Sequence, residues 1–206
     1  MTDLVQGVAD APVVPRGVGG TGPRPGMGIV PVRGLPVVAV LIALLIAAIG
    51  TNRLWALDFF HVVGGALWTG IDLFVGLVVG PIIGRMSIPA RAEFSARFMP
   101  KMLLIMPTIV TMPLAAGFQL ARQDAFLDTS NPKHAWVVAS FFVVGIMATI
   151  ALAYLEPANV AVLFELRKAQ PDGQVIEKLM KRFVYTAGIT GVMQVVTLII
   201  MTRLVS

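Results

Sequence analysis

The stretch LWALDFFHVVGGALWTGIDLFVGLVVGPIIGRM, residues 54–86, is apolar almost throughout, yet it carries a histidine and an aspartate deep within it. A helix needs only about 20 apolar residues to cross the hydrocarbon core of a bilayer, and this stretch is longer than that. The stretch therefore predicts a membrane-spanning helix, and with it an all-α protein.

The polar residues of this helix are expected to share one face. At about 100° per residue, Gly65, Trp68 and Asp72 fall on the face of His61, and Gly64 lies beside them. Imidazole and carboxylate groups are costly in hydrocarbon and mark functional sites, so these five residues predict a cofactor site in which the glycines admit a flat ligand or another helix. The alternative is a helix-packing groove in which His61 hydrogen-bonds a threonine or a backbone carbonyl.

The composition indicates an integral membrane protein. Hydrophobic residues make up 57% of the chain and charged residues 13%, and the mean hydropathy is +0.85. With no cysteine, the chain has no disulfide, thiolate metal site, cysteine-ligated iron–sulfur cluster or covalently attached c-type haem. The net charge of +5 does not indicate a nucleic-acid partner, because the basic residues gather in short loops beside apolar segments.

The apolar segments predict a polytopic transmembrane helical bundle with a four-helix core and one added N-terminal helix. Residues 1–34 are rich in Gly and Pro and are expected to form a disordered cytoplasmic tail. The first helix is short, and a signal-anchor is the alternative for it. The five spans are expected near residues 35–50, 54–84, 102–121, 135–155 and 183–203.

The distribution of Lys and Arg predicts the orientation. Twelve of the 16 lie in the tail, the loop after the second span and the loop after the fourth. The positive-inside rule then places the N-terminus in the cytoplasm and the C-terminus outside, in the cell (inner) membrane with the lipid bilayer as surroundings. Residues 157–182 are expected to form a cytoplasmic helical hairpin whose arms pack on each other, or on subunits of a membrane complex.

The run FHVVGGALWTG, residues 60–70, resembles the first-helix signature of the CopD/HemJ-like superfamily of small four-helix membrane proteins, in which a His is followed seven residues later by Trp and then by a nearby Gly. The superfamily includes the HemJ-type membrane protoporphyrinogen oxidase and the CopD-like copper-resistance proteins. The resemblance extends loosely through Pro107 and Trp136, over residues 54–205.

The resemblance implies that His61 binds b-type haem. The oxidase branch also relies on a Lys inside its third core helix, whereas residues 135–155 contain none. Haem or copper binding is therefore implied more directly than porphyrinogen oxidation, and whether the chain is an enzyme stays open. If it is one, a membrane oxidoreductase is expected.

Second ligands for the metal are few. His134 is the only other histidine, and it is expected at the outer mouth of the fourth span, on the same side of the membrane as His61. It is a candidate metal ligand with His61, although an interfacial, solvated His134 is the alternative. Met99, Met102, Met106 and Met112 are thioether candidates, although apolar filling explains them better.

Three functions follow from these patterns. The first is a haem b-binding, or copper-binding, membrane protein that takes part in electron transfer, alone or as a subunit of a respiratory complex. The second is a cofactor-free accessory subunit of a larger membrane complex. The third is a small transporter or channel component that uses Asp72 and Gln194.

Overall fold

The computed structural model describes residues 31–205, and all the regular structure in this part of the chain is helical. Five helical passes in it are long and apolar enough to cross a membrane, which confirms an all-α polytopic bundle. The helices are α1 (Leu35–Thr51), α2 (Leu54–Phe74), α3 (Gly80–Arg85), α4 (Ile88–Gln123), α5 (His134–Ile150), α6 (Glu156–Leu166) and α7 (Gly173–Val205). The Gly/Pro-rich tail predicted at residues 1–34 lies almost wholly outside the described residues.

The core helices extend further than the apolar segments. The structure starts the third pass at Ile88 instead of residue 102, ends the fourth at Leu166 and starts the fifth at Gly173. Hydropathy marks only the part of a helix that lies in hydrocarbon, whereas the helix itself ends where the backbone is interrupted. The extended conformation at Met86 and Ser87 separates α3 from α4.

Two passes share an irregularity. A π-helical segment, Val75–Val79, joins α2 to α3, and a second one, Ala151–Leu155, joins α5 to α6. In both, a proline follows two residues after the π-helical segment, at Pro81 and Pro157. Proline has no N–H to donate to the carbonyl four residues earlier, and a wider turn is one way to accommodate it.

The freed carbonyl in the second of these segments has a partner. Pro157 cannot donate to the carbonyl oxygen of Ala153, and the Nη2 atom of Arg182 lies 3.4 Å from that oxygen. The same guanidinium lies over the ring of Tyr154, 5.2 Å from its centroid. A basic residue of α7 therefore stabilises the irregular segment.

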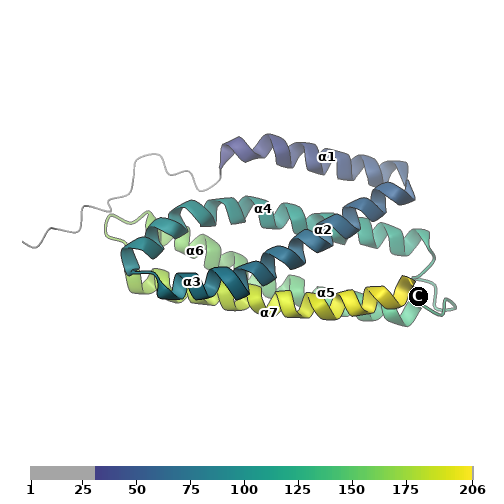
Figure 1. The fold of residues 1–206 in the computed structure, drawn as a ribbon. Helices are drawn as coiled ribbons and strands as arrows, with labels where there is room; N and C mark the ends of the chain where they lie inside the picture. Colours follow the sequence, from purple (N-terminus) through teal and green to yellow (C-terminus); the bar gives the residue numbers. More distant parts are fainter. Residues whose placement is uncertain (1–30, 206) are drawn as a thin grey trace, which may run out of the picture.

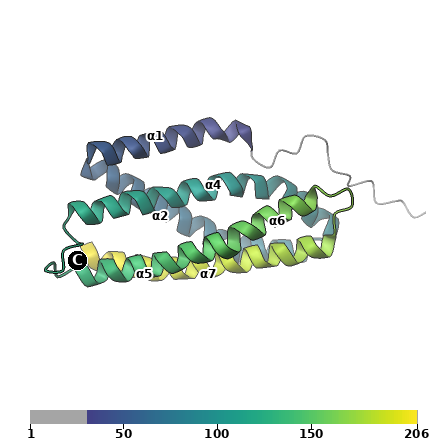
Figure 2. The same ribbon diagram turned by 180° about the vertical axis from the view of Figure 1, so that it is seen from behind.

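The helices form an elongated bundle in which α2 crosses diagonally (Figure 1). The first residues of α2 lie beside α1 and α4, and its last residues lie beside α7. The α3 helix then continues along α7. Seen from behind, α6 leaves α5 and reaches α4 (Figure 2). We call the end that holds residues 86–87 and 167–172 the basic end, because basic residues lie in and beside both of these connections.

At the basic end the two arms of the predicted hairpin, α6 and the start of α7, pack against each other. Both also contact α4, and an ion pair of 2.8 Å joins Nη1 of Arg91 on α4 to Oε2 of Glu177 on α7. The hairpin is therefore part of a larger helical assembly at this end.

Candidate functional site

His61 lies at the crossing of α2 and α4. Its Nδ1 atom is 2.9 Å from the carbonyl oxygen of Pro113. Because a carbonyl only accepts hydrogen bonds, Nδ1 carries the hydrogen and Nε2 keeps its lone pair. This is the tautomer in which an imidazole can bind a metal through Nε2.

Gly117 makes room for this ring. A Cβ atom at position 117 would lie 2.5 Å from Nδ1 of His61. Gly117 is four residues after Pro113, so a side chain there would also stand beside the Pro113 carbonyl that His61 uses. The α4 helix thus provides both the acceptor and the space.

The two glycines after His61 have different surroundings. A Cβ atom at Gly64 would lie 2.6 Å from Cδ of Pro113 and 2.9 Å from Cβ of Met112, so another helix fills this space. At Gly65 the nearest such atom is 4.0 Å away. Of the two expectations for these glycines, close helix approach applies to Gly64, whereas a Cβ atom at Gly65 would make only an ordinary van der Waals contact with Pro113.

Trp68 and Asp72 form one buried unit. The Trp68 side chain is hydrogen-bonded to the carboxylate of Asp72, one turn further along α2. Oδ2 of the same carboxylate accepts hydrogen bonds from Oγ1 of Thr190 at 2.9 Å and from Nε2 of Gln194 at 3.0 Å. Thr190 and Gln194 of α7 therefore hold the Asp72 carboxylate of α2 across the interface of the two helices.

The predicted stripe therefore meets two different neighbours. His61 and Gly64 contact α4, whereas Asp72 contacts α7, because α2 crosses from one helix to the other. Trp68 lies between them and packs in a core cluster with Met106 and Met147. The site consists of two adjoining parts along α2: an imidazole held on α4, and an indole–carboxylate pair held on α7.

His134 has a partner of its own. Its Nδ1 atom is 3.0 Å from the carbonyl oxygen of Phe126, in the loop before α5. Its ring is thus oriented by a loop, whereas the ring of His61 is oriented by α4. Between residues 31 and 205, the structure brings no three His, Asp or Glu side chains together in a way that could hold a metal ion.

The methionines of α4 lie in the core. Met99 is fully buried, and Met106 and Met112 are nearly so. They belong to three separate hydrophobic clusters along the bundle, which fits their interpretation as apolar filling.

No protein-family model matches this chain, and no curated protein or solved structure is significantly similar to it. The CopD/HemJ-like resemblance consequently stays a prediction from residues 60–70.

The sequence analysis did not identify the glycines of the neighbouring helices α4 and α7 that allow close contact with the pass from α2 to α3. Gly117 was not singled out, nor was Gly188, whose Cα would lie 2.6 Å from a Cβ atom at Gly76. The sequence does carry a signal for the second contact: Gly76, Gly80 and Gly84 repeat every fourth residue, the spacing that lets membrane helices approach closely.

Proposed function

We propose that this chain is an integral protein of the cell (inner) membrane that binds haem b through His61 and takes part in electron transfer. One observation carries the proposal: Nδ1 of His61 is fixed on the carbonyl of Pro113. Metal-binding histidines in proteins characteristically donate their second N–H in this way, which sets the tautomer and the ring orientation.

The surrounding residues fit a flat, apolar group with one imidazole ligand. Nε2 of His61 would bind the iron, the macrocycle edge would lie beside Gly65, which is less crowded than Gly64, and the buried indole of Trp68 would wall the site. Bound haem would supply one-electron redox chemistry. The chain's own contribution is to hold the imidazole, to exclude water with apolar helices, and to place the Asp72 carboxylate one turn from Trp68.

Copper binding at His61 has less support than haem binding. The described part of the chain offers no set of three His, Asp or Glu side chains, so copper would need thioether ligands beside His61. The methionines of α4 already fill core clusters. Haem needs only the imidazole that the structure orients.

The test is an absorption spectrum of the protein purified in detergent after expression with sufficient haem supply, oxidised and then reduced with dithionite, with metal analysis of the same sample. A Soret band with sharp α and β bands on reduction supports the proposal. A featureless spectrum together with the absence of iron and copper contradicts it.

A second candidate is a cofactor-free accessory subunit of a larger membrane complex. The tight fit of Gly64 against Pro113 and the hydrogen bond from His61 to the Pro113 carbonyl favour it, because both contacts are expected of a helix-packing groove. This candidate predicts that the purified chain is colourless, that it co-purifies with partner subunits through the basic end, and that partner capture survives His61→Ala.

A further inference from the structure

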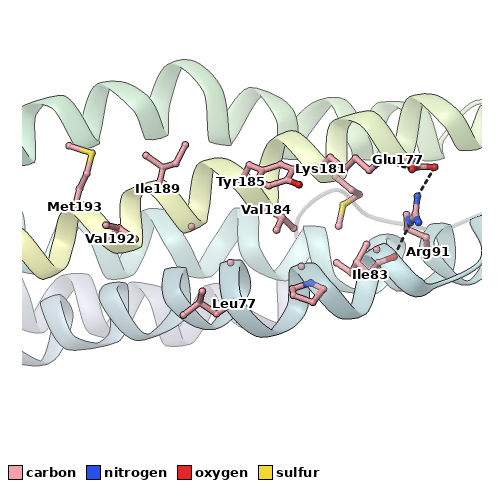
Figure 3. A pocket seen from close by; sticks show the side chains of 16 residues that line it. Leu77, Ile83, Arg91, Glu177, Lys181, Val184, Tyr185, Ile189, Val192 and Met193 are labelled. Carbon is pink, nitrogen blue, oxygen red and sulfur yellow. Dashed lines mark hydrogen bonds and ion pairs between the residues drawn. The ribbon is translucent and has the colours of Figure 1, made fainter.

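An open groove runs along the bundle between α7 on one side and the pass from α2 to α3 on the other (Figure 3). Its volume is about 650 Å³, within the range of small-molecule sites. It extends along α7 from Glu177 to Met193, which is about 24 Å at 1.5 Å per residue. That exceeds the roughly 15 Å depth of one hydrocarbon leaflet, so the groove reaches from headgroup level into the bilayer.

The two ends of the groove differ in chemistry. Arg91, Glu177 and Lys181 lie together at the basic end, whereas Val192 and Met193 lie at the far end (Figure 3). The carboxylate of Glu177 is shared, because Nη1 of Arg91 and Nζ of Lys181 each lie 2.8 Å from one of its oxygens. Two cations and one anion leave this end with a single net positive charge.

The basic end of the groove has further positive charge around it. Arg85 is exposed at the end of α3, next to Ile83 and Gly84, which line the groove. Lys181 itself is 61% exposed, so its ammonium group is accessible to a ligand in the groove. Anionic headgroups are attracted to basic clusters at the cytoplasmic surface, and basic pockets between membrane helices bind such headgroups.

The groove is long and slender. It extends for about 24 Å with a volume of about 650 Å³, a shape that suits an extended hydrocarbon chain. The apolar walls and the exposed Tyr185 at the side match the acyl and interfacial levels of a lipid.

We propose that this groove binds one anionic phospholipid of the cytoplasmic leaflet, with an acyl chain along α7 toward Val192 and the headgroup phosphate at Lys181. Arg91 is buried and holds the floor of the headgroup end through hydrogen bonds to the carbonyl oxygens of Ile83 and Met86, both at 3.2 Å. Lys181 pairs with Glu177 but is largely exposed, so its ammonium group can also reach the phosphate.

The experiment is native mass spectrometry of the full chain released from vesicles of equal parts phosphatidylcholine and phosphatidylglycerol. We expect the wild type to retain one phosphatidylglycerol in preference to phosphatidylcholine. Lys181→Gln should lower that preference about fivefold, since one basic residue near the surface contributes roughly that factor. Lys178→Gln is the matched control: it is exposed on the same helix but does not line the groove, and it should change the preference less than twofold.

Filling the groove tests the position of the acyl chain. No atom lies within 4 Å of a Cβ built at Gly84, which lines the groove, or at Gly70, which does not. Gly84→Leu should lose the retained lipid and Gly70→Leu should keep it. If Gly84→Leu fails to fold, a second pair of variants serves instead. Val192 lines the groove and Val196, one turn further along α7, does not, so Val192→Phe should lose the lipid and Val196→Phe should keep it.

Three results would overturn the proposal. They are equal retention of both lipids by the wild type, retention unchanged by Gly84→Leu and Val192→Phe, and a dimer that dissociates in those variants, which would identify the groove as a protein interface. None of these results depends on haem content, so the lipid site and the proposed function fail or survive separately.

Discussion

Gly117 of α4 lies directly against the imidazole of His61 on α2, so close that a Cβ atom at position 117 would be 2.5 Å from Nδ1 and 2.6 Å from Cε1. The imidazole occupies the volume that a side chain would otherwise fill. The position of the ring therefore depends on a residue of another helix, 56 positions later in the sequence.

Gly117→Ala should displace the imidazole from the Pro113 carbonyl. Overpacking of a tight contact costs about 1–3 kcal/mol, and we expect a loss of that size in the free energy of unfolding, measured by denaturation with dodecyl sulfate in mixed micelles. Gly145→Ala is the matched control, because nothing lies within 4 Å of a Cβ at Gly145. Equal stability of the two variants would contradict the close contact.

Asp72→Leu should destabilise the bundle. The substitution removes the acceptor of Trp68 and Gln194 and leaves both donors in an apolar interior, whereas Thr190 keeps the carbonyl oxygen of Ala187 as an acceptor. Hydrogen bonds between membrane helices contribute about 0.6 kcal/mol on average and at most about 1.7, so we expect a loss of about 1–3 kcal/mol in the same unfolding assay.

Asp72→Asn is the control for this site, because its amide oxygen still accepts. It should lose less than half of what Asp72→Leu loses. If the leucine variant is as stable as the wild type, the cluster around Asp72 does not hold α2 to α7.

The class of fold was predictable, and the partners of the site were not. Apolar length and spacing predict the five membrane-spanning passes correctly, though not where the helices end, because both are properties of a single segment. The identity of the helix facing His61 depends on the diagonal course of α2, which brings the first half of the stripe to α4 and the second half to α7. No local pattern in residues 54–86 predicts where α2 crosses from α4 to α7.

The contact between Gly76 and Gly188 is asymmetric. A Cβ at Gly76 would lie 2.6 Å from the Cα of Gly188, whereas a Cβ at Gly188 would lie 3.6 Å from the Cα of Gly76. Gly76→Ala must push two backbones apart and should cost about 3 kcal/mol. Gly188→Ala adds only an ordinary contact and should be neutral or slightly stabilising, since alanine favours the helix.

Thermal or dodecyl sulfate unfolding of these two variants, with the double variant, checks the asymmetry. A larger loss in Gly188→Ala than in Gly76→Ala would show that α2 and α7 approach each other differently from this structure.

The ion pair between Arg91 and Glu177 should be stronger than the one between Lys181 and Glu177. Arg91 is 7% exposed and Lys181 is 61% exposed, while both lie 2.8 Å from Glu177. We expect a coupling energy of about 1–3 kcal/mol for the first pair in a double-mutant cycle, and about 0.3–0.5 kcal/mol for the second.

The salt dependence of the two coupling energies tests this difference. Raising the ionic strength should weaken the Lys181 coupling and leave most of the Arg91 coupling, because buried pairs are screened less. Equal couplings with equal salt dependence would mean that Arg91 is accessible to water.

The buried position of Arg91 illustrates a second limit of sequence reasoning. Counting basic residues correctly groups Arg91 with its neighbours at one end of the bundle. The count cannot separate a solvated charge such as Arg97, which is 71% exposed, from one that bonds Glu177 and two backbone carbonyls. That distinction arises only where α3, α4 and α7 meet.

The most direct test compares the reduced visible spectra of His61→Ala and His134→Ala with that of the wild type, on samples that insert and fold equally well by circular dichroism. Both histidines are oriented by backbone carbonyls, so each serves as the control for the other. The account predicts that His61→Ala loses the α and β bands of haem b and that His134→Ala keeps them. Unchanged haem content in His61→Ala would contradict it.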